Sequence, residues 1–342
     1  MHVLITNDDG PPSEEASPYV LSLYRALKKY TDWEVSVAIP NTQRSWIGKA
    51  HMIGQDVTAS YIYPNDPTSS DEGYYDYQGP YDVPQQDKAH KDEWVLLDAT
   101  PASCANIGIH HMFNHKSPVD LVISGPNFGR NSTALYIMSS GTVGAAMEAA
   151  LCGVRAIGIS YAYETKTHDH NLIDTASRLA VELVEHLYTN WDTKDGVQLY
   201  SVNIPLVEGL GDSTRVLYAH ILQNQWGPVF EPWEDFERRR DADPKAVAEE
   251  EELHIGVPVP SLIEDGDSNQ LTHQTNGTAN RNKARRQFRW KPDYQAVRDS
   301  VKGSKEGNDG WAVDQGHISV TPLRACFHVV DIAGDIKLQH KK

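Results

Sequence analysis

Two adjacent carboxylates, Asp8 and Asp9, are the residues of this chain best suited to metal or acid–base chemistry. They follow an apolar run at 2–6 that predicts a buried strand, and Gly10 directly after them allows a sharp turn. Adjacent acids repel each other, so a site that keeps both ionised usually supplies a cation. An ordinary Asx turn explains this short motif about equally well when it is taken alone.

Three further segments carry oxygen atoms or anion-binding features, and each follows a predicted strand. One contains Arg44, which can meet a phosphate, and Ser45, which offers an oxygen ligand. A second contains Asn127, an uncharged oxygen ligand or hydrogen-bond donor. The third, at 139–146, begins a helix whose exposed N–H groups can hold a phosphate, with N-capping by Ser140 as the alternative. Without His or Cys, this set suits Mg²⁺ or Mn²⁺ better than zinc.

A parallel sheet is needed to bring these segments together, and the chain shows the alternation of strands and helices that builds one. Helices are predicted from Ser17 with Pro18 at the first helical position, after Thr100-Pro101, at 141–151 and around 172–187. Strands are predicted at 2–6, 33–39, 94–97, 120–124, 155–161 and 197–203. We therefore expect a three-layer, doubly wound, mostly parallel α/β fold that binds ligands beyond the carboxyl ends of its strands.

Two stretches interrupt this alternation. Residues from about 56 to 93 are rich in Tyr, Pro, Asp, Ser and Gly, and residues from about 231 to 283 combine charged runs with a Ser/Asn/Gly/Thr run. We interpret both as insertions, the first as a loop and the second as solvated chain, in a single domain spanning 1–342. Residues 287–290 and 317–320 predict strands outside the core sheet.

Composition excludes some classes of function. The 342 residues are 39% hydrophobic and 23% charged, as in ordinary globular proteins, and no apolar run reaches the length of a membrane span. A net charge of −16 argues against generic nucleic-acid binding, and it requires a local positive element, such as a bound cation, if the substrate is an anion. The cysteines Cys104, Cys152 and Cys326 are interpreted as buried reduced thiols, and no secretory signal is evident, so we expect a cytoplasmic protein.

Taken together, the motifs resemble the SurE family of nucleotidases and acid phosphatases in order and spacing. The matching segments are Ile5–Gly10, Pro40–Ser45, Ser124–Asn131 and Ser140–Glu148, with further matches at 99–101, 202–205 and 314–323. The resemblance spans most of residues 1–228 and 286–330. Ala99 and Ser103 stand where bacterial members usually carry Gly and Asp, which is typical of a fungal or other eukaryotic branch.

The resemblance implies a Rossmann-like SurE fold with extra C-terminal strands, acting as a phosphomonoesterase of the acid phosphatase or 5′- or 3′-nucleotidase type. It implies that Mg²⁺ or Mn²⁺ binds and activates water for attack on a small phosphomonoester such as a nucleotide. It also implies a homodimer or higher homo-oligomer. The implied metal ligands are Asp8, Asp9, Ser45 and Asn127, the catalytic residues are Asp8, Asp9 and Asn127, and the phosphate-binding residues are Ser140, Gly141 and Thr142.

Two alternatives remain at this point. The same fold can serve as a binding or scaffold module in an RNA or regulatory complex with little turnover, which the intact ligand set argues against. An aspartyl-phosphate phosphatase of the haloacid-dehalogenase kind requires Asp-x-Asp after its first strand. Here Asp8 and Asp9 are adjacent and Gly10 follows at once, so this alternative is disfavoured.

Overall fold

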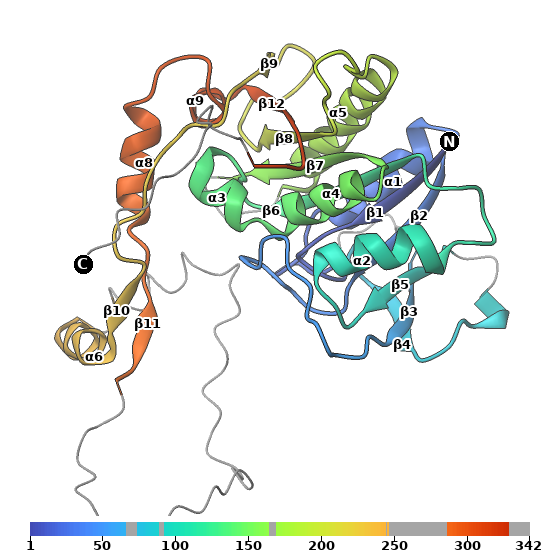
Figure 1. Ribbon diagram of the computed structural model, residues 1–342, viewed down its shortest axis with the longest axis horizontal. Helices are drawn as coiled ribbons and strands as arrows, with labels where there is room; N and C mark the ends of the chain where they lie inside the picture. Colours follow the sequence, from blue (N-terminus) through green and yellow to red (C-terminus); the bar gives the residue numbers. More distant parts are fainter. Residues whose placement is uncertain (66–73, 89–91, 164–168, 244, 246–285, 328–342) are drawn as a thin grey trace, which may run out of the picture.

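A central ten-stranded sheet organises the part of the chain that the computed structural model describes, namely residues 1–65, 74–88, 92–163, 169–243, 245 and 286–327 (Figure 1). Its strand order is β4-β3-β5-β2-β1-β6-β7-β8-β12-β9. The strands are β1 (His2–Thr6), β2 (Glu34–Pro40), β3 (Ala59–Pro64), β4 (Tyr77–Tyr81), β5 (Trp94–Leu97), β6 (Leu121–Phe128), β7 (Arg155–Ala162), β8 (Leu199–Pro205), β9 (Val216–Tyr218) and β12 (Ile318–Leu323).

The middle of this sheet is the predicted parallel core. Strands β5, β2, β1, β6, β7 and β8 lie side by side and all pair in parallel. From β1 the chain proceeds to β2 and β5 on one side, and later to β6, β7 and β8 on the other. The strand order therefore reverses between β1 and β6, the point at which open α/β sheets bind ligands.

Helices cover both faces of the sheet, which confirms the expected three-layer α/β fold. Helices α1 (Val20–Tyr30) and α5 (His170–Thr189) pack on one face, and α2 (Pro101–Ile107) and α4 (Gly141–Leu151) pack on the other (Figure 1). Val3 and Ile5 belong to the core cluster that contains residues of α1 and α5, whereas Leu4 belongs to the cluster that contains residues of α2 and α4. Successive side chains of β1 point to opposite faces of the sheet because a strand has a period of two residues.

Several local predictions are wrong. Helix α1 begins at Val20, because the Ser17 hydroxyl donates a hydrogen bond to the Gly10 carbonyl at 2.9 Å instead of capping the helix. Strands β3 and β4 extend the sheet antiparallel from β5, so part of the first insertion is sheet and not loop. Strand β12 pairs antiparallel with β8 inside the main sheet, not outside it. Cys104 is buried as expected, but Cys326 is exposed.

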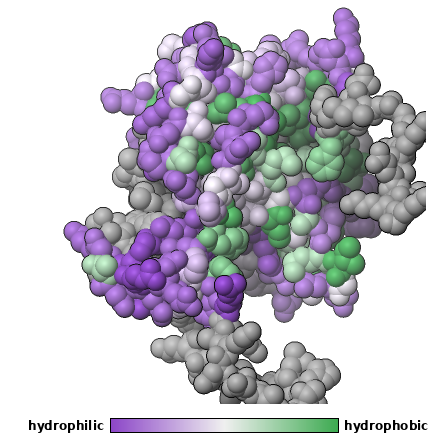
Figure 2. Space-filling model, turned by 60° about the vertical axis from the view of Figure 1, so that its left-hand side comes forward, coloured by the Kyte–Doolittle hydropathy of each residue, from purple (hydrophilic) through white to green (hydrophobic). Residues whose placement is uncertain are grey.

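A small arm stands beside the main sheet. Strands β10 (Phe230–Pro232) and β11 (Phe288–Trp290) pair antiparallel, so β11 lies outside the main sheet as predicted. Helices α6 (Trp233–Ala242) and α8 (Tyr294–Lys302) flank this ribbon (Figure 1). Figure 2 brings this side forward and shows a mostly hydrophilic surface at the lower left, with hydrophobic and pale residues between it and the main body.

Four short helical segments complete the described chain. They are α3 (Thr133–Ser139), α9 (Asp309–Asp314), a 3₁₀ turn (Gln86–Lys88) and a π-helical turn (Gly108–Met112). In these described ranges, no helix combines the length and the apolar character that crossing a membrane requires. Residues 246–285, most of the second predicted insertion, lie outside the described residues.

Candidate metal centre

The predicted site residues meet where the strand order reverses. Asp8 and Asp9 follow the end of β1, and Asn127 lies in the neighbouring strand β6. The predicted strand at 120–124 continues to Phe128, with a register shift between Ser124 and Asn127, so Asn127 belongs to a strand and not to a loop. Thr142 reaches the same place from the first turn of α4.

Hydrogen bonds join these side chains. The Thr142 hydroxyl contacts Asp8 Oδ1 at 2.5 Å and Asn127 Oδ1 at 3.2 Å, so it bridges the two oxygens. Asp9 Oδ2 accepts a hydrogen bond of 2.7 Å from the backbone N–H of Phe128. Asp8 and Asp9 are each 2% exposed. The structure therefore gathers a carboxylate pair, an amide oxygen and a hydroxyl into one nearly buried group.

Asn7 shapes the turn that carries the carboxylates, and its role was not foreseen from the sequence. Its Oδ1 accepts from the Gly10 N–H at 3.1 Å, and its Nδ2 donates to the Gly10 carbonyl at 2.8 Å. Gly10 adopts φ +86°, and a Cβ there would lie 3.1 Å from the carbonyl carbon of Thr42. The Asx-type interaction is thus made by Asn7, which leaves the side chains of Asp8 and Asp9 to the site.

The loop that contains Ser45 is tied to the site by its backbone on both sides. The N–H of Arg44 donates to the Asp8 carbonyl at 2.7 Å, and the N–H of Gly48 donates to the Ser139 carbonyl at 2.9 Å. The Arg44 side chain pairs with Asp98 at 2.7 Å, and this contact was not expected. Among the described residues no hydrogen bond joins Ser45 to Asp8 or Asp9, so Ser45 as a ligand stays a prediction.

The N-terminus of α4 faces Asp8. The Ser140 hydroxyl oxygen accepts from the Val143 N–H at 3.0 Å, which is the N-cap that the sequence offered as an alternative. Gly141 packs so closely that a Cβ at this position would lie 2.7 Å from the Cβ of Asp8. These contacts position Asp8 at the positive end of the helix dipole. A phosphate-binding role for Ser140, Gly141 and Thr142 stays a prediction.

Burial shifts the protonation of both acids. It raises the pKa of Asp8 to about 6, although hydrogen bonds from the Thr142 side chain and from nearby backbone N–H groups act in the opposite direction. Burial and the charge of Asp8 raise the pKa of Asp9 well above its usual value, opposed by the hydrogen bond from the Phe128 N–H. The site therefore disfavours two uncompensated negative charges, and a cation would relieve this.

The donor set fits a hard divalent cation. Across the ranges that the structure describes, no Lys or Arg pairs with Asp8 or Asp9, and no three His, Cys, Asp or Glu side chains gather into a metal-binding group. Ligands beyond the two carboxylates must then be neutral oxygens, such as that of Asn127. An all-oxygen set of this kind suits Mg²⁺ or Mn²⁺ and not zinc.

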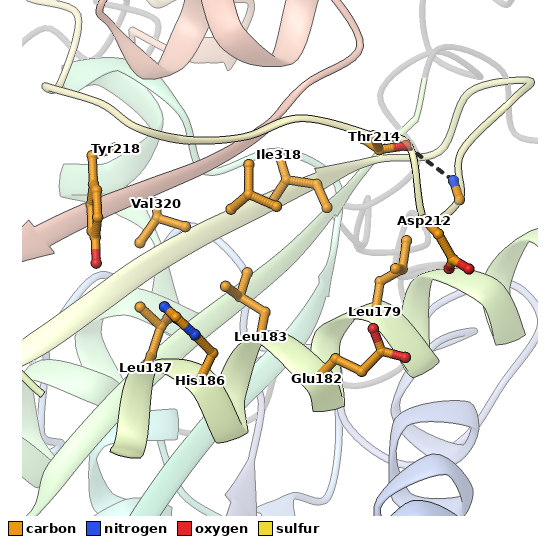
Figure 3. A pocket seen from close by; sticks show the side chains of 12 residues that line it. Leu179, Glu182, Leu183, His186, Leu187, Asp212, Thr214, Tyr218, Ile318 and Val320 are labelled. Atoms are coloured by element: carbon orange, nitrogen blue, oxygen red, sulfur yellow. Dashed lines mark hydrogen bonds between the residues drawn. The ribbon is translucent and has the colours of Figure 1, made fainter. Parts of the chain in front are cut away.

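A separate groove of about 420 Å³ lies between α5 and the strands β9 and β12 (Figure 3). Its acidic side chains, Glu182 and Asp212, pair with Arg178 at 2.6 and 2.5 Å, and its floor is apolar. None of the predicted site residues lines it. The groove therefore does not compete with the carboxylate pair as the candidate centre.

Comparisons with known proteins identify the family of this chain. The family model described as survival protein SurE matches residues 3–228. A Saccharomyces cerevisiae protein named "Probable tubulin--tyrosine ligase PBY1" is 38% identical over 367 aligned residues, which cover all of this chain and 43% of that protein. A Campylobacter fetus protein named "5'-nucleotidase SurE" is 32% identical over 205 residues, 60% of this chain and 66% of that protein.

A solved structure supports the fold alone. The SurE protein from Aquifex aeolicus superposes with a TM-score of 0.57 at 19% sequence identity, covering 96% of this chain and 95% of that one. This superposition supports the α/β fold described above. The family match covers well over half of the residues and includes both strands that carry the carboxylates and Asn127. The chain therefore belongs to the SurE family.

Proposed function

We propose that this chain is a divalent-metal-dependent phosphoric monoester hydrolase of the nucleotidase or acid phosphatase type. The observation that carries the proposal is the buried pair Asp8 and Asp9, joined to Asn127 and Thr142 at the switch point of the sheet. Family membership and the names of its nucleotidase relatives support it. The chain spans 43% of its yeast relative and 66% of its Campylobacter relative, so the activity of any longer protein is part of the same proposal.

In this proposal Asp8, Asp9 and Asn127 hold the cation, and Ser45 supplies a further oxygen. When bound, a divalent cation provides positive charge that polarises the phosphoryl group and acidifies water. Thr142 orients Asp8 by donating to it, while the Phe128 N–H fixes Asp9. Asp8 or Asp9 accepts the proton of the attacking water. The N-terminus of α4 then stabilises negative charge on the phosphoryl oxygens.

The class of substrate, the kind of cation and the oligomeric state are parts of the same proposal. The substrate is a small phosphomonoester, with nucleotides as the leading class, and the cation is Mg²⁺ or Mn²⁺. We also propose a homodimer or higher homo-oligomer assembled through the C-terminal strands. A cytoplasmic location, expected from the cysteines, stays a prediction.

The first test is hydrolysis of an aryl phosphate and a panel of nucleoside monophosphates with Mg²⁺, Mn²⁺ or a chelator. We expect turnover that the chelator removes. Asp8→Asn preserves the shape of the side chain and should lower kcat about 10³-fold or more, because it removes one of two charges that hold the cation. Asp98→Asn is the matched control, since Asp98 is an exposed acid paired with Arg44. Undiminished activity in Asp8→Asn would refute the assignment.

The same measurement decides the rival hypothesis of a scaffold module. A scaffold binds metal or nucleotide without turnover, so a folded sample that hydrolyses nothing with any cation would favour it. In that case Asp8→Asn would change the binding of metal or nucleotide, and neither the variant nor the unmodified chain would hydrolyse a substrate.

A further inference from the structure

A cluster of five aromatic side chains gathers around Trp46, two residues after Arg44, whose backbone N–H donates to the Asp8 carbonyl at 2.7 Å. Trp46 follows Ser45 directly, and its ring centroid is 5.9 Å from that of Tyr136, 6.2 Å from Trp226 and 5.5 Å from Trp290. Trp226 in turn lies 6.3 Å from Tyr136 and 6.3 Å from Tyr294. We call these five residues, Trp46, Tyr136, Trp226, Trp290 and Tyr294, the aromatic cluster.

The cluster joins segments that are far apart in the sequence. Trp46 comes from the loop after β2 and Tyr136 from α3, which leads directly into Ser140 and α4. Trp290 ends β11 and Tyr294 begins α8, so both come from the arm and from outside the family match at 3–228. The arm thus contributes two of the five members of the cluster, Trp290 and Tyr294.

The cluster is not a closed core. All five side chains are half-buried, whereas aromatic residues of the interior such as Trp94, Tyr19 and Tyr161 are 0% exposed. Aromatic rings with some exposed area can stack on a planar group of a ligand, because part of each ring remains accessible.

The backbone around the cluster is strained. Trp46 has φ +63°, and Thr133, which begins the helix that carries Tyr136, has φ +72°. Bulky and β-branched residues avoid this region at a cost of about 1 kcal/mol or more, and such outliers gather at functional sites. Asp309 holds Thr133 in place by accepting its N–H at 2.8 Å.

Tyr163 links the cluster to the carboxylates. Burial and the charge of Asp9 raise its pKa to about 12, while Arg130 acts in the opposite direction and Tyr294 adds to the rise. The ring of Tyr163 also stacks on Phe128, whose N–H binds Asp9, with the centroids 4.8 Å apart.

We propose that the aromatic cluster binds the organic group of the substrate and selects phosphomonoesters whose organic group is planar and aromatic. This inference rests on the proposed hydrolase activity, because it places the phosphoryl group at Asp8 and Asp9. Stacking accepts any flat π face, so nucleobases and simple aryl groups share this chemistry. In this subsite, Trp290 and Tyr294 of the arm act together with Trp46, Tyr136 and Trp226 of the family match.

The test compares two kinds of substrate in one variant. We expect Trp226→Leu to lower the ratio of kcat/KM for AMP to kcat/KM for glycerol 2-phosphate about tenfold, since stacking on one base is typically lost with the ring. Trp226→Phe keeps a ring and should restore most of the ratio. Trp233→Leu is the matched control, because Trp233 is a half-buried arm residue that packs on Phe236. p-Nitrophenyl phosphate, as a third substrate, separates a general aryl preference from a nucleobase preference.

A binding measurement keeps this inference separate from the hydrolase proposal. Calorimetric titration of the Asp8→Asn chain with AMP needs no turnover, and adding Trp226→Leu should weaken binding about tenfold while Trp233→Leu should not. An unchanged ratio of kcat/KM, or an equal loss for both substrates, would overturn the cluster as a subsite. If the chain hydrolyses nothing but loses AMP binding with Trp226, the activity proposal fails and the subsite stands.

Discussion

Gly141 offers a sharp test of the candidate centre, because a side chain at this position would press on Asp8 while leaving the backbone N–H groups of α4 in place. A Cβ added at this position would lie 2.7 Å from the Cβ and 2.9 Å from Oδ2 of Asp8, and 3.1 Å from Cγ of Pro101. Ordinary contact begins near 3.4 Å, so in Gly141→Ala either Asp8 or α4 must move by about 0.7 Å.

The expected effects on stability and on activity differ. Overpacking of this kind costs about 1–3 kcal/mol, and the better helix propensity of Ala returns up to about 1 kcal/mol, so the free energy of unfolding falls by about 0–3 kcal/mol. A misplacement approaching 1 Å in a catalytic group costs about 10²-fold in rate. We therefore expect Gly141→Ala to lower kcat/KM by about 10- to 100-fold while the protein stays folded.

The assay is metal-dependent hydrolysis of an aryl phosphate, read together with thermal unfolding. Gly158→Ala is the matched control, because its new methyl group meets Ala146 Cβ at 3.8 Å and Thr142 Cγ2 and carbonyl oxygen at 3.9 Å, which are all ordinary contacts. Full activity in Gly141→Ala would refute the close packing of α4 against Asp8 as a requirement of the site. An equal loss of kcat/KM in Gly158→Ala would show that the effect of Gly141→Ala does not come from contact with Asp8.

Two further predictions concern the packing around the site. Burial alone would raise the pKa of Glu148, but hydrogen bonds from Lys49 and Asn106 and the charges of Lys49 and His51 outweigh it and lower this pKa. The resulting stabilisation is present above pH 4.5 and is lost as the pH falls through the lowered pKa, so Glu148→Gln should reduce the free energy of unfolding by about 1–3 kcal/mol at pH 7. Denaturant unfolding at pH 7 and pH 3 checks this, and an equal difference at both would contradict it. Asp309 accepts hydrogen bonds from the backbone N–H groups of Thr133, Leu222 and Gly310. Asp309→Ala should therefore lower the free energy of unfolding by about 3 kcal/mol or more, whereas Asp309→Asn keeps one side-chain acceptor and should lower it by less. Equal melting temperatures for Asp309→Ala and the unmodified chain would show that these N–H groups find other acceptors.

Local features were predictable because their signals lie in adjacent residues. The strand at Trp94–Leu97, the helix capped by Thr100 and the helix at Gly141–Leu151 capped by Ser140 were predicted and are confirmed. The parallel core follows from the alternation of such elements. Ser17, by contrast, has the residue type of an N-cap but binds the Gly10 turn, and only packing of that turn decides between the two.

The sequence by itself determined the fold class and predicted that Asp8, Asp9 and Asn127 follow core strands, because strand period, turn chemistry and motif order are properties of short segments. Only the tertiary structure decided that the two strands concerned, β1 and β6, are neighbours and that Asn127 lies within β6. Only the tertiary structure decided that Thr142 bridges Asp8 and Asn127, since its partner Asp8 lies 134 positions away in the chain. The same holds for β12, which joins the main sheet, and for the aromatic cluster, whose members come from separate segments. Contacts of this kind arise from complementary packing of distant surfaces, which leaves no periodic signal in any one segment.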